Sequence, residues 1–188
     1  SAWAKSSPVQ RAEDAPAAAR KAVVYATCFV NYNEPSMGED ALEILACNGV
    51  ETEVLHPMCC GMPKLEHGDI EGVADAARTV AAAFKPWIDK GYDVVALTPS
   101  CSLMLKFEWP LILPDDADVR RLSKATRDIS EYIVDIAKNE GLADGMSALD
   151  GSVTVHLSCH SRAQNMGQKA AELLRLIPDA DVQVIERC

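Results

Sequence analysis

The stretch VVYATCFVNYNEPSMGEDALEILACNGVETEVLHPMCC (residues 23–60) decides the fold, because a similar stretch returns near the end of the sequence as VTVHLSCHSRAQNMGQKAAELLRLIPDADVQVIERC (residues 153–188). Each begins with an apolar strand that ends in a cysteine, Cys28 or Cys159. Each continues through a Met-Gly pair, an amphipathic helix and a second strand, and then reaches another cysteine, Cys59 or Cys188. A repeated strand–helix–strand unit predicts two similar lobes, of which the second is cut off at its second cysteine.

The segments between these two stretches keep the same alternation of short apolar runs and amphipathic helices. We expect strands at 21–27, 50–56, 92–98, 152–158 and 181–186, and helices at 36–47, 69–90, 101–113, 118–139 and near 163–176. The helix at 36–47 is expected to begin with a capping box, in which Ser36 and Glu39 satisfy its first N–H groups. This order predicts an α/β fold made of Rossmann-like lobes, each a parallel sheet flanked by helices.

Composition divides the chain and excludes several classes of protein. Residues 1–20 are rich in Ala, Ser and Pro and are expected to form a linker or tail, followed by a first lobe at 21–150 and the start of an incomplete second lobe at 151–188. The net charge of −10 argues against a nucleic-acid partner. No apolar run approaches the length of a membrane span, and the first residues lack a signal-peptide pattern, so we expect a cytoplasmic protein.

Seven cysteines are the most informative part of the composition. Seven is an odd number and amounts to about 4% of the chain, too few for a disulfide scaffold. Six of them follow a predicted strand closely, and the carboxyl ends of parallel strands share one edge of a sheet. We therefore expect the following cysteines to lie at such an edge: Cys28, Cys59, Cys60, Cys101, Cys159 and Cys188. The exception is Cys47, which is expected to be buried on the inner face of the first helix.

Four thiolates at one edge could bind either zinc or an iron–sulfur cluster. The set is Cys28, Cys59, Cys60 and Cys101, and the direct neighbours Cys59 and Cys60 favour a cluster over a single small ion. His156 and His160 flank Cys159 and could complete a site, with His56 and His67 as weaker candidates. Thiols without a metal and thiol–disulfide catalysis are the remaining alternatives, although a disulfide between adjacent cysteines is strained.

The pattern Cys28-x30-Cys59-Cys60-Gly61-x40-Cys101-x2-Met104 resembles the CCG, or cysteine-rich, domain family. This family includes the B subunit of heterodisulfide reductase and the iron–sulfur subunits of glycolate oxidase and anaerobic glycerol-3-phosphate dehydrogenase. The resemblance extends over residues 21–188. Met104 stands where the family has the last cysteine of its Cys-x-x-Cys motif, and no Cys-Gly follows Cys188. The ferredoxin-type cysteine motifs that usually precede these domains are absent from the sequence.

The resemblance implies an electron-transfer module of a multi-subunit oxidoreductase that is not catalytic by itself. It implies a [4Fe–4S] cluster, non-cubane in the heterodisulfide reductase branch, with zinc as the alternative and subunit docking as the corresponding function. Handling in air is expected to remove an exposed cluster. The implied partners are a flavoprotein dehydrogenase subunit and a ferredoxin-type domain, with a quinone or a disulfide as electron acceptor. Such a complex would attach the domain to the inner face of the membrane only through its partners.

Overall fold

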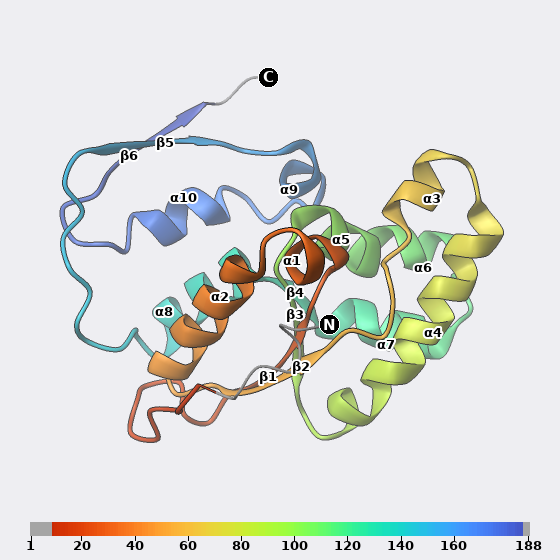
Figure 1. The fold of residues 1–188 in the computed structure, drawn as a ribbon, viewed down its shortest axis with the longest axis horizontal. Coiled ribbons are helices and arrows are strands. Elements are labelled where there is room, and N and C mark those ends of the chain that lie inside the picture. Colours follow the sequence, from red (N-terminus) through yellow and green to blue (C-terminus); the bar gives the residue numbers. More distant parts are fainter. Residues whose placement is uncertain (1–8, 186–188) are drawn as a thin grey trace.

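The computed structural model describes residues 9–185 and has the α/β architecture that the sequence predicts. Within those residues, the main sheet has four strands in the order β2-β1-β3-β4, all parallel (Figure 1). Its strands are β1 (Lys21–Tyr25), β2 (Glu51–Leu55), β3 (Asp93–Ala96) and β4 (Thr126–Asp128). The two central strands, β1 and β3, are almost entirely buried, as a sheet covered on both faces requires.

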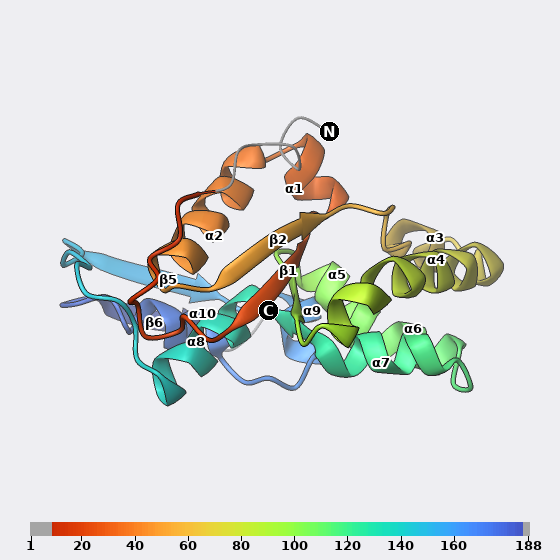
Figure 2. The ribbon, with the colours of Figure 1, turned by 90° about the horizontal axis from the view of Figure 1, so that it is seen from below.

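Helices connect and cover these strands. They are α1 (Cys28–Tyr32), α2 (Pro35–Cys47), α3 (Met62–Glu66), α4 (Ile70–Asp89), α5 (Pro99–Leu103), a π-helical turn (Met104–Glu108), α6 (Trp109–Ile112), α7 (Ala117–Ala125), α8 (Ile129–Asn139), α9 (Cys159–Ala163) and α10 (Lys169–Leu174). Figure 1 shows α2 and α8 on one side of the sheet and α4, α6 and α7 on the other, and the view from below in Figure 2 agrees. The main lobe is therefore a three-layered sandwich.

Alternate residues of the central strands build two separate cores. The first core packs Phe84 of α4 and residues of α6 and α7 against one face of the sheet, which contributes Val23, Tyr25, Val94 and Ala96. The second core contains the strand residues next to those of the first core, whose side chains point to the opposite face of the sheet. It packs Ala22, Val24 and Val95 against Leu45 of α2 and Ile136 of α8. This period of two places both faces of each strand in apolar surroundings. At about 25 cal/mol per Å² of buried apolar surface, these cores are the main source of stability.

Two expected helix boundaries are wrong. The helix α2 begins at Pro35, whose fixed φ suits the first helical position, and its N-cap residue Glu34 makes no side-chain capping bond. Ser36 donates to the Glu34 carboxylate at 2.5 Å, so the expected capping box with Glu39 does not form. The single helix expected at 118–139 is divided by β4, which pairs with β3 and is followed by a capping box at Asp128.

A second, smaller sheet comes from the later part of the chain. Its two strands, β5 (Ser152–His156) and β6 (Asp181–Ile185), are parallel and pair residue by residue over five positions, as β1 and β2 do. Helix α10 lies between this sheet and α8 (Figure 1). In contrast to β1, both strands alternate between exposed and half-buried residues, because α10 covers only one face.

The segment before β1 packs against the end of α2. Ala17 is fully buried, and its N–H donates to the Asn48 carbonyl at 3.0 Å. The N–H of Ala12 likewise donates to the Ala46 carbonyl at 3.0 Å. Gly49 has a φ of +84° and lies against Ala12, where a β-carbon would be 2.7 Å from the Ala12 oxygen. Across residues 9–185, none of the helices combines the length and the apolar character needed to cross a membrane.

Candidate functional site

The strand order places a topological switch point at the carboxyl ends of β1 and β3. The chain leaves β1 toward β2 on one side and later adds β3 and β4 on the other, and α/β sheets bind ligands at such a switch point. Thr27 caps α1, which starts at Cys28, and Thr98 precedes α5, which carries Cys101. The hydroxyls of Thr27 and Thr98 are 2.9 Å apart and share a hydrogen bond. Cys28 and Cys101 are thereby held on neighbouring loops at the switch point.

The adjacent cysteines arrive from the third neighbouring strand end. Cys59 and Cys60 follow β2, and Gly61 then turns the chain with a φ of +82°, in the left-handed region that glycine tolerates. The N–H of Gly61 donates to the Cys59 sulfur at 3.5 Å. This turn lets the chain enter α3 directly behind the cysteine pair.

The structure brings these four cysteines together, and we call Cys28, Cys59, Cys60 and Cys101 the thiol cluster. The sulfur atoms of Cys60 and Cys101 are 3.3 Å apart, and the Cys59 thiol lies within hydrogen-bonding reach of both Cys28 and Cys60. Cys60 and Cys101 are buried, whereas Cys28 and Cys59 are half-buried. The expected convergence of these four residues at one sheet edge is therefore observed.

Burial and contact with a neighbouring thiol raise the pKa values of three members of the thiol cluster. Burial, reinforced by Cys59, raises the pKa of Cys28 to about 11. Contact with Cys101 raises the pKa of Cys60 to about 12. Contact with Cys60 raises the pKa of Cys59. Without a cation, Cys28, Cys59 and Cys60 are therefore protonated at neutral pH, and a cationic metal centre would displace those protons.

Two buried aromatic donors fix the backbone on either side of Cys59. The Tyr25 hydroxyl donates to the Met58 carbonyl at 2.7 Å, and the Trp109 indole N–H donates to the Cys60 carbonyl at 3.2 Å. Both side chains are fully buried. Burial raises the pKa of Tyr25, and all four members of the thiol cluster add to that rise. Sequence reasoning did not identify Tyr25 or Trp109, because nothing in the residue pattern shows which carbonyl a core aromatic will reach.

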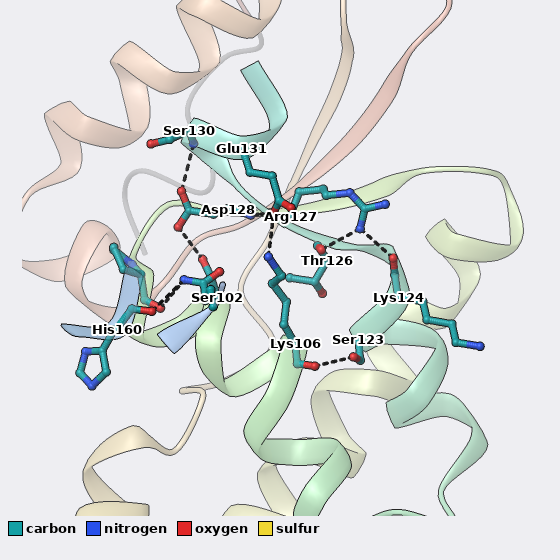
Figure 3. A network of polar contacts seen from close by, with 12 residues as sticks. Ser102, Lys106, Ser123, Lys124, Thr126, Arg127, Asp128, Ser130, Glu131 and His160 are labelled. Carbon is teal, nitrogen blue, oxygen red and sulfur yellow. Dashed lines mark hydrogen bonds and ion pairs between the residues drawn. The ribbon is translucent and has the colours of Figure 1, made fainter. Parts of the chain in front are cut away.

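A polar network supports the loop that carries Cys101 (Figure 3). Ser102 donates to the Asp128 carboxylate at 3.0 Å, and Asp128 in turn accepts the Ser130 N–H at 3.0 Å. Lys106 pairs with Glu131 at 2.7 Å. Burial raises the pKa of Asp128, although the two donated hydrogen bonds oppose that rise. The network ties α5 and the π-helical turn to β4 and α8.

The candidate ligands at and after the end of β5 are largely exposed and come from different elements. Cys159 is exposed at the start of α9, His160 follows it in that helix, and His156 is exposed at the end of β5. Helix α9 packs on α5, and the Gln164 amide donates to the Pro99 carbonyl at 3.2 Å. Cys188 lies outside the described residues.

The expectation that Cys47 is buried is wrong. Leu45 and Ala46 face the core, and the next residue, rotated by about 100° around the helix, is exposed. Cys47 lines a largely apolar cavity of about 540 Å³ between α2, α8 and α10, together with Ile44 and Leu173. This cavity shares no lining residue with the thiol cluster.

The chemistry of the donors decides which cofactor fits. All four members of the thiol cluster are sulfur donors, the ligands that iron–sulfur clusters use. Among residues 9–185, no three Cys, His, Asp or Glu side chains are gathered around one point as ligands of a single metal ion. Met104, at the position of the absent fifth cysteine, is fully buried in the core. The donor set of the thiol cluster is therefore sulfur alone, which is the chemistry that suits an iron–sulfur or metal cofactor.

Comparison with known proteins leads to the same residues. The family model described as "Cysteine-rich domain" (CCG) matches residues 22–106. One subunit of the anaerobic glycerol-3-phosphate dehydrogenase of Escherichia coli K12 is 29% identical over 85% of this chain, which spans 40% of that relative. Lactate utilization protein A of Bacillus pumilus is 28% identical over 89% of this chain and 69% of its own length. That of Bacillus cytotoxicus is 30% identical over 74% of this chain and 57% of its own length.

No solved structure matches the chain. The segment that matches the family model runs from β1 to the π-helical turn and contains every member of the thiol cluster. The similarity to the CCG family of cysteine-rich domains is thus carried by residues 22–106.

Proposed function

We propose that this domain holds an iron–sulfur cluster on Cys28, Cys59, Cys60 and Cys101 and passes electrons within a multi-subunit oxidoreductase. The observation that carries this proposal is the contact among four thiols from three different loops at the switch point of the sheet. Sulfur donors at such a site suit electron transfer, since iron–sulfur clusters are held by cysteine thiolates.

The residues of the chain supply position and shielding. The aromatic donors Tyr25 and Trp109 hold the two carbonyls that flank Cys59, so the adjacent thiols are set in place by the folded core. Burial of Cys60 and Cys101 keeps water from that side of the site. When bound, a [4Fe–4S] cluster supplies one-electron redox chemistry, and a non-cubane form would need a ligand in addition to these four.

The relatives suggest the source of the electrons. One belongs to a glycerol-3-phosphate dehydrogenase and another is a lactate utilization protein, so the substrate class is a small hydroxyl compound. A flavoprotein partner would oxidise the CH–OH group to C=O, which releases two electrons and two protons. The electrons would pass singly, through a ferredoxin-type domain and this domain, to a quinone or a disulfide that takes up two protons. We place such a complex in the cytoplasm, attached to the inner face of the membrane through its partners.

The second repeat is proposed to contribute further ligands. Ser158 caps α9 directly before Cys159, as Thr27 caps α1 directly before Cys28, and both helices have five residues. We assign Cys159 and Cys188 as cofactor ligands of the second lobe, with His156 and His160 as additional donors.

A structural zinc site that supports subunit docking is the second candidate. It is favoured by the direct approach of two buried thiols, Cys60 and Cys101, at 3.3 Å, because thiolate pairs are common zinc ligands.

Metal analysis of anaerobically prepared protein distinguishes the two candidates. The chain is reconstituted with ferrous iron and sulfide, and iron, acid-labile sulfide and zinc are measured together with the electron paramagnetic resonance spectrum after reduction. We expect about four irons and four sulfides, lost in Cys60→Ser and Cys101→Ser and retained in Cys47→Ser, whose thiol lies outside the site. A colourless protein with one tightly bound zinc would replace the first proposal with the second.

A further inference from the structure

Asn31 is buried without hydrogen-bond partners for its side chain. Its exposed fraction is 5%, and among the residues that the structure describes neither its amide nitrogen nor its carbonyl oxygen has a partner. A buried amide that gives up water without a replacement is destabilising, and most buried polar groups in folded proteins are paired. The side chain of Asn31 therefore has hydrogen-bonding capacity that the described protein does not use.

The position of Asn31 connects it with the thiol cluster. Asn31 lies three residues after Cys28 and four after Thr27, so these residues share one face of the first helical turn. Its N–H donates to the Thr27 carbonyl at 2.8 Å, which confirms the helical spacing. The Thr27 hydroxyl on that face bonds to Thr98, which precedes the helix of Cys101. The face of α1 that carries Asn31 is thus the one turned toward the loop of Cys101.

The side chain of His56 also has a buried polar atom without a hydrogen-bond partner in the part of the chain that the structure describes. The Nδ1 atom of His56 is buried and has no hydrogen-bond partner among residues 9–185. The imidazole stacks on Tyr25, with ring centroids 6.4 Å apart, and meets Tyr32, the neighbour of Asn31, edge to face at 5.9 Å. Tyr25 is also the side chain whose pKa all four thiols raise. Two unused polar groups, from α1 and from the end of β2, therefore flank the same sheet edge.

We propose that the Asn31 amide donates a hydrogen bond to a sulfur atom of the bound cluster, as a positioning residue that sets its reduction potential. This inference rests on the proposed function, since it needs the cluster as the acceptor. Hydrogen bonds to cluster sulfurs stabilise the more negatively charged, reduced state, and they are one of the known determinants of the potential. The pairing also gives a partner to a buried amide that has none among the described residues.

The test compares two buried asparagines. In Asn31→Leu an unpartnered amide is replaced by an apolar side chain of similar size. In the control Asn48→Leu, the amide that is lost donates to the Ile44 carbonyl at 2.8 Å and accepts from the Ala143 N–H at 2.9 Å. Both variants are measured metal-free, by thermal unfolding, and reconstituted with iron and sulfide, by redox titration and electron paramagnetic resonance.

We expect the two variants to differ in opposite ways in the melting temperature and in the reduction potential. Metal-free Asn31→Leu should melt at the wild-type temperature or above it, whereas Asn48→Leu should melt several degrees lower because it loses two satisfied hydrogen bonds. In the reconstituted proteins, Asn31→Leu should shift the potential to more negative values and change the g values of the reduced spectrum. Asn48→Leu should leave both unchanged.

Two results would overturn the inference while leaving the proposed function intact. One is a metal-free Asn31→Leu as unstable as Asn48→Leu, which would mean that the amide is already satisfied within the protein, for example by a bound water. The other is a reconstituted Asn31→Leu with the wild-type potential and spectrum. A wild-type protein that takes up no iron and sulfide would instead overturn the proposed function and the inference together.

Discussion

The side-chain hydroxyls of Thr27 and Thr98 are joined by a hydrogen bond of 2.9 Å across the switch point of the sheet. Thr27 also accepts the N–H of Val30 and so closes the first turn of α1. Thr27 is fully buried and Thr98 is half-buried. The bond therefore links the loop of Cys28 directly to the loop of Cys101, in a place that is largely shielded from solvent.

Replacing Thr98 by valine is expected to lower the free energy of unfolding by about 1–2 kcal/mol, since the buried Thr27 hydroxyl loses its bond to Thr98 and retains only the Val30 N–H, while the shape is kept. Urea unfolding of the metal-free protein measures this change. Thr52→Val is the matched control, because the Thr52 hydroxyl donates to the Val50 carbonyl two residues earlier in the chain and its loss should cost under about 0.5 kcal/mol. Equal losses in the two variants would contradict the role given to the Thr27–Thr98 bond.

The Tyr25 hydroxyl is expected to be required for stability at the cysteine pair. Tyr25→Phe keeps the ring in the core and removes the donor to the Met58 carbonyl, which should cost about 1 kcal/mol in urea unfolding. Tyr32→Phe alters a side chain that is 66% exposed and should have no measurable effect. The prediction fails if Tyr25→Phe is as stable as the wild-type protein.

Alkylation of Cys28 is expected to be slow at neutral pH in the reduced, metal-free protein. Burial and the neighbouring Cys59 raise the pKa of Cys28 to about 11, and only the thiolate reacts. Because this pKa is about two units above that of an ordinary thiol, the fraction of Cys28 present as thiolate near pH 8 should be roughly 100-fold smaller. The rate with iodoacetamide, followed by peptide mass spectrometry, should rise about tenfold per pH unit up to about pH 11. A plateau near pH 9 would show that the pKa of Cys28 is not raised, and exposed Cys47 serves as the internal reference for reagent access.

The carboxyl group of Asp128 is expected to make stability depend on pH. Burial raises its pKa in the folded state above the value of about 4 in an unfolded chain. Between these two pKa values the folded state binds more protons, so the free energy of unfolding falls as pH rises through that interval. Asp128→Asn keeps an oxygen that can cap α8 and removes the ionisation.

The stability of this variant relative to wild type should therefore increase as pH rises from about 4. Urea unfolding at a series of pH values measures the difference. Because the cause is burial, the trend should persist in 1 M salt. A difference that is constant with pH would contradict the assignment to Asp128.

The sequence predicted the α/β order well because the strands at 21–25 and 93–96 are short, largely apolar and separated by amphipathic helices. The predicted helix boundaries were wrong where two local sequence signals disagreed about where a helix begins. The spacing of Asp128 and Glu131 is a capping box that marks a helix start, but the apolar period continues across it and suggested one long helix. Ser36 and Glu39 have the same spacing without that outcome, because Pro35 already occupies the first helical position.

At the site, the positions of the cysteines could be predicted from the sequence, whereas the hydrogen bonds that hold their backbone could not. Convergence of Cys28, Cys59, Cys60 and Cys101 could be predicted, since the ends of parallel strands must share an edge. The contributions of Tyr25 and Trp109 could not, because a hydrogen bond to one particular carbonyl depends on the packed rotamer of a side chain that looks like any other core aromatic.

The origin of the four thiols in three separate loops also has a mechanical consequence. A group bound to all four would cross-link the connections after β1, β2 and β3, which the sheet alone joins only through backbone hydrogen bonds. Closing such long loops removes chain entropy from the unfolded state, in the way that a disulfide does. Local opening of any one of these loops would then require release of the others, so the loaded domain should exchange its amide hydrogens in this region as one cooperative unit, whereas the metal-free domain can open loop by loop.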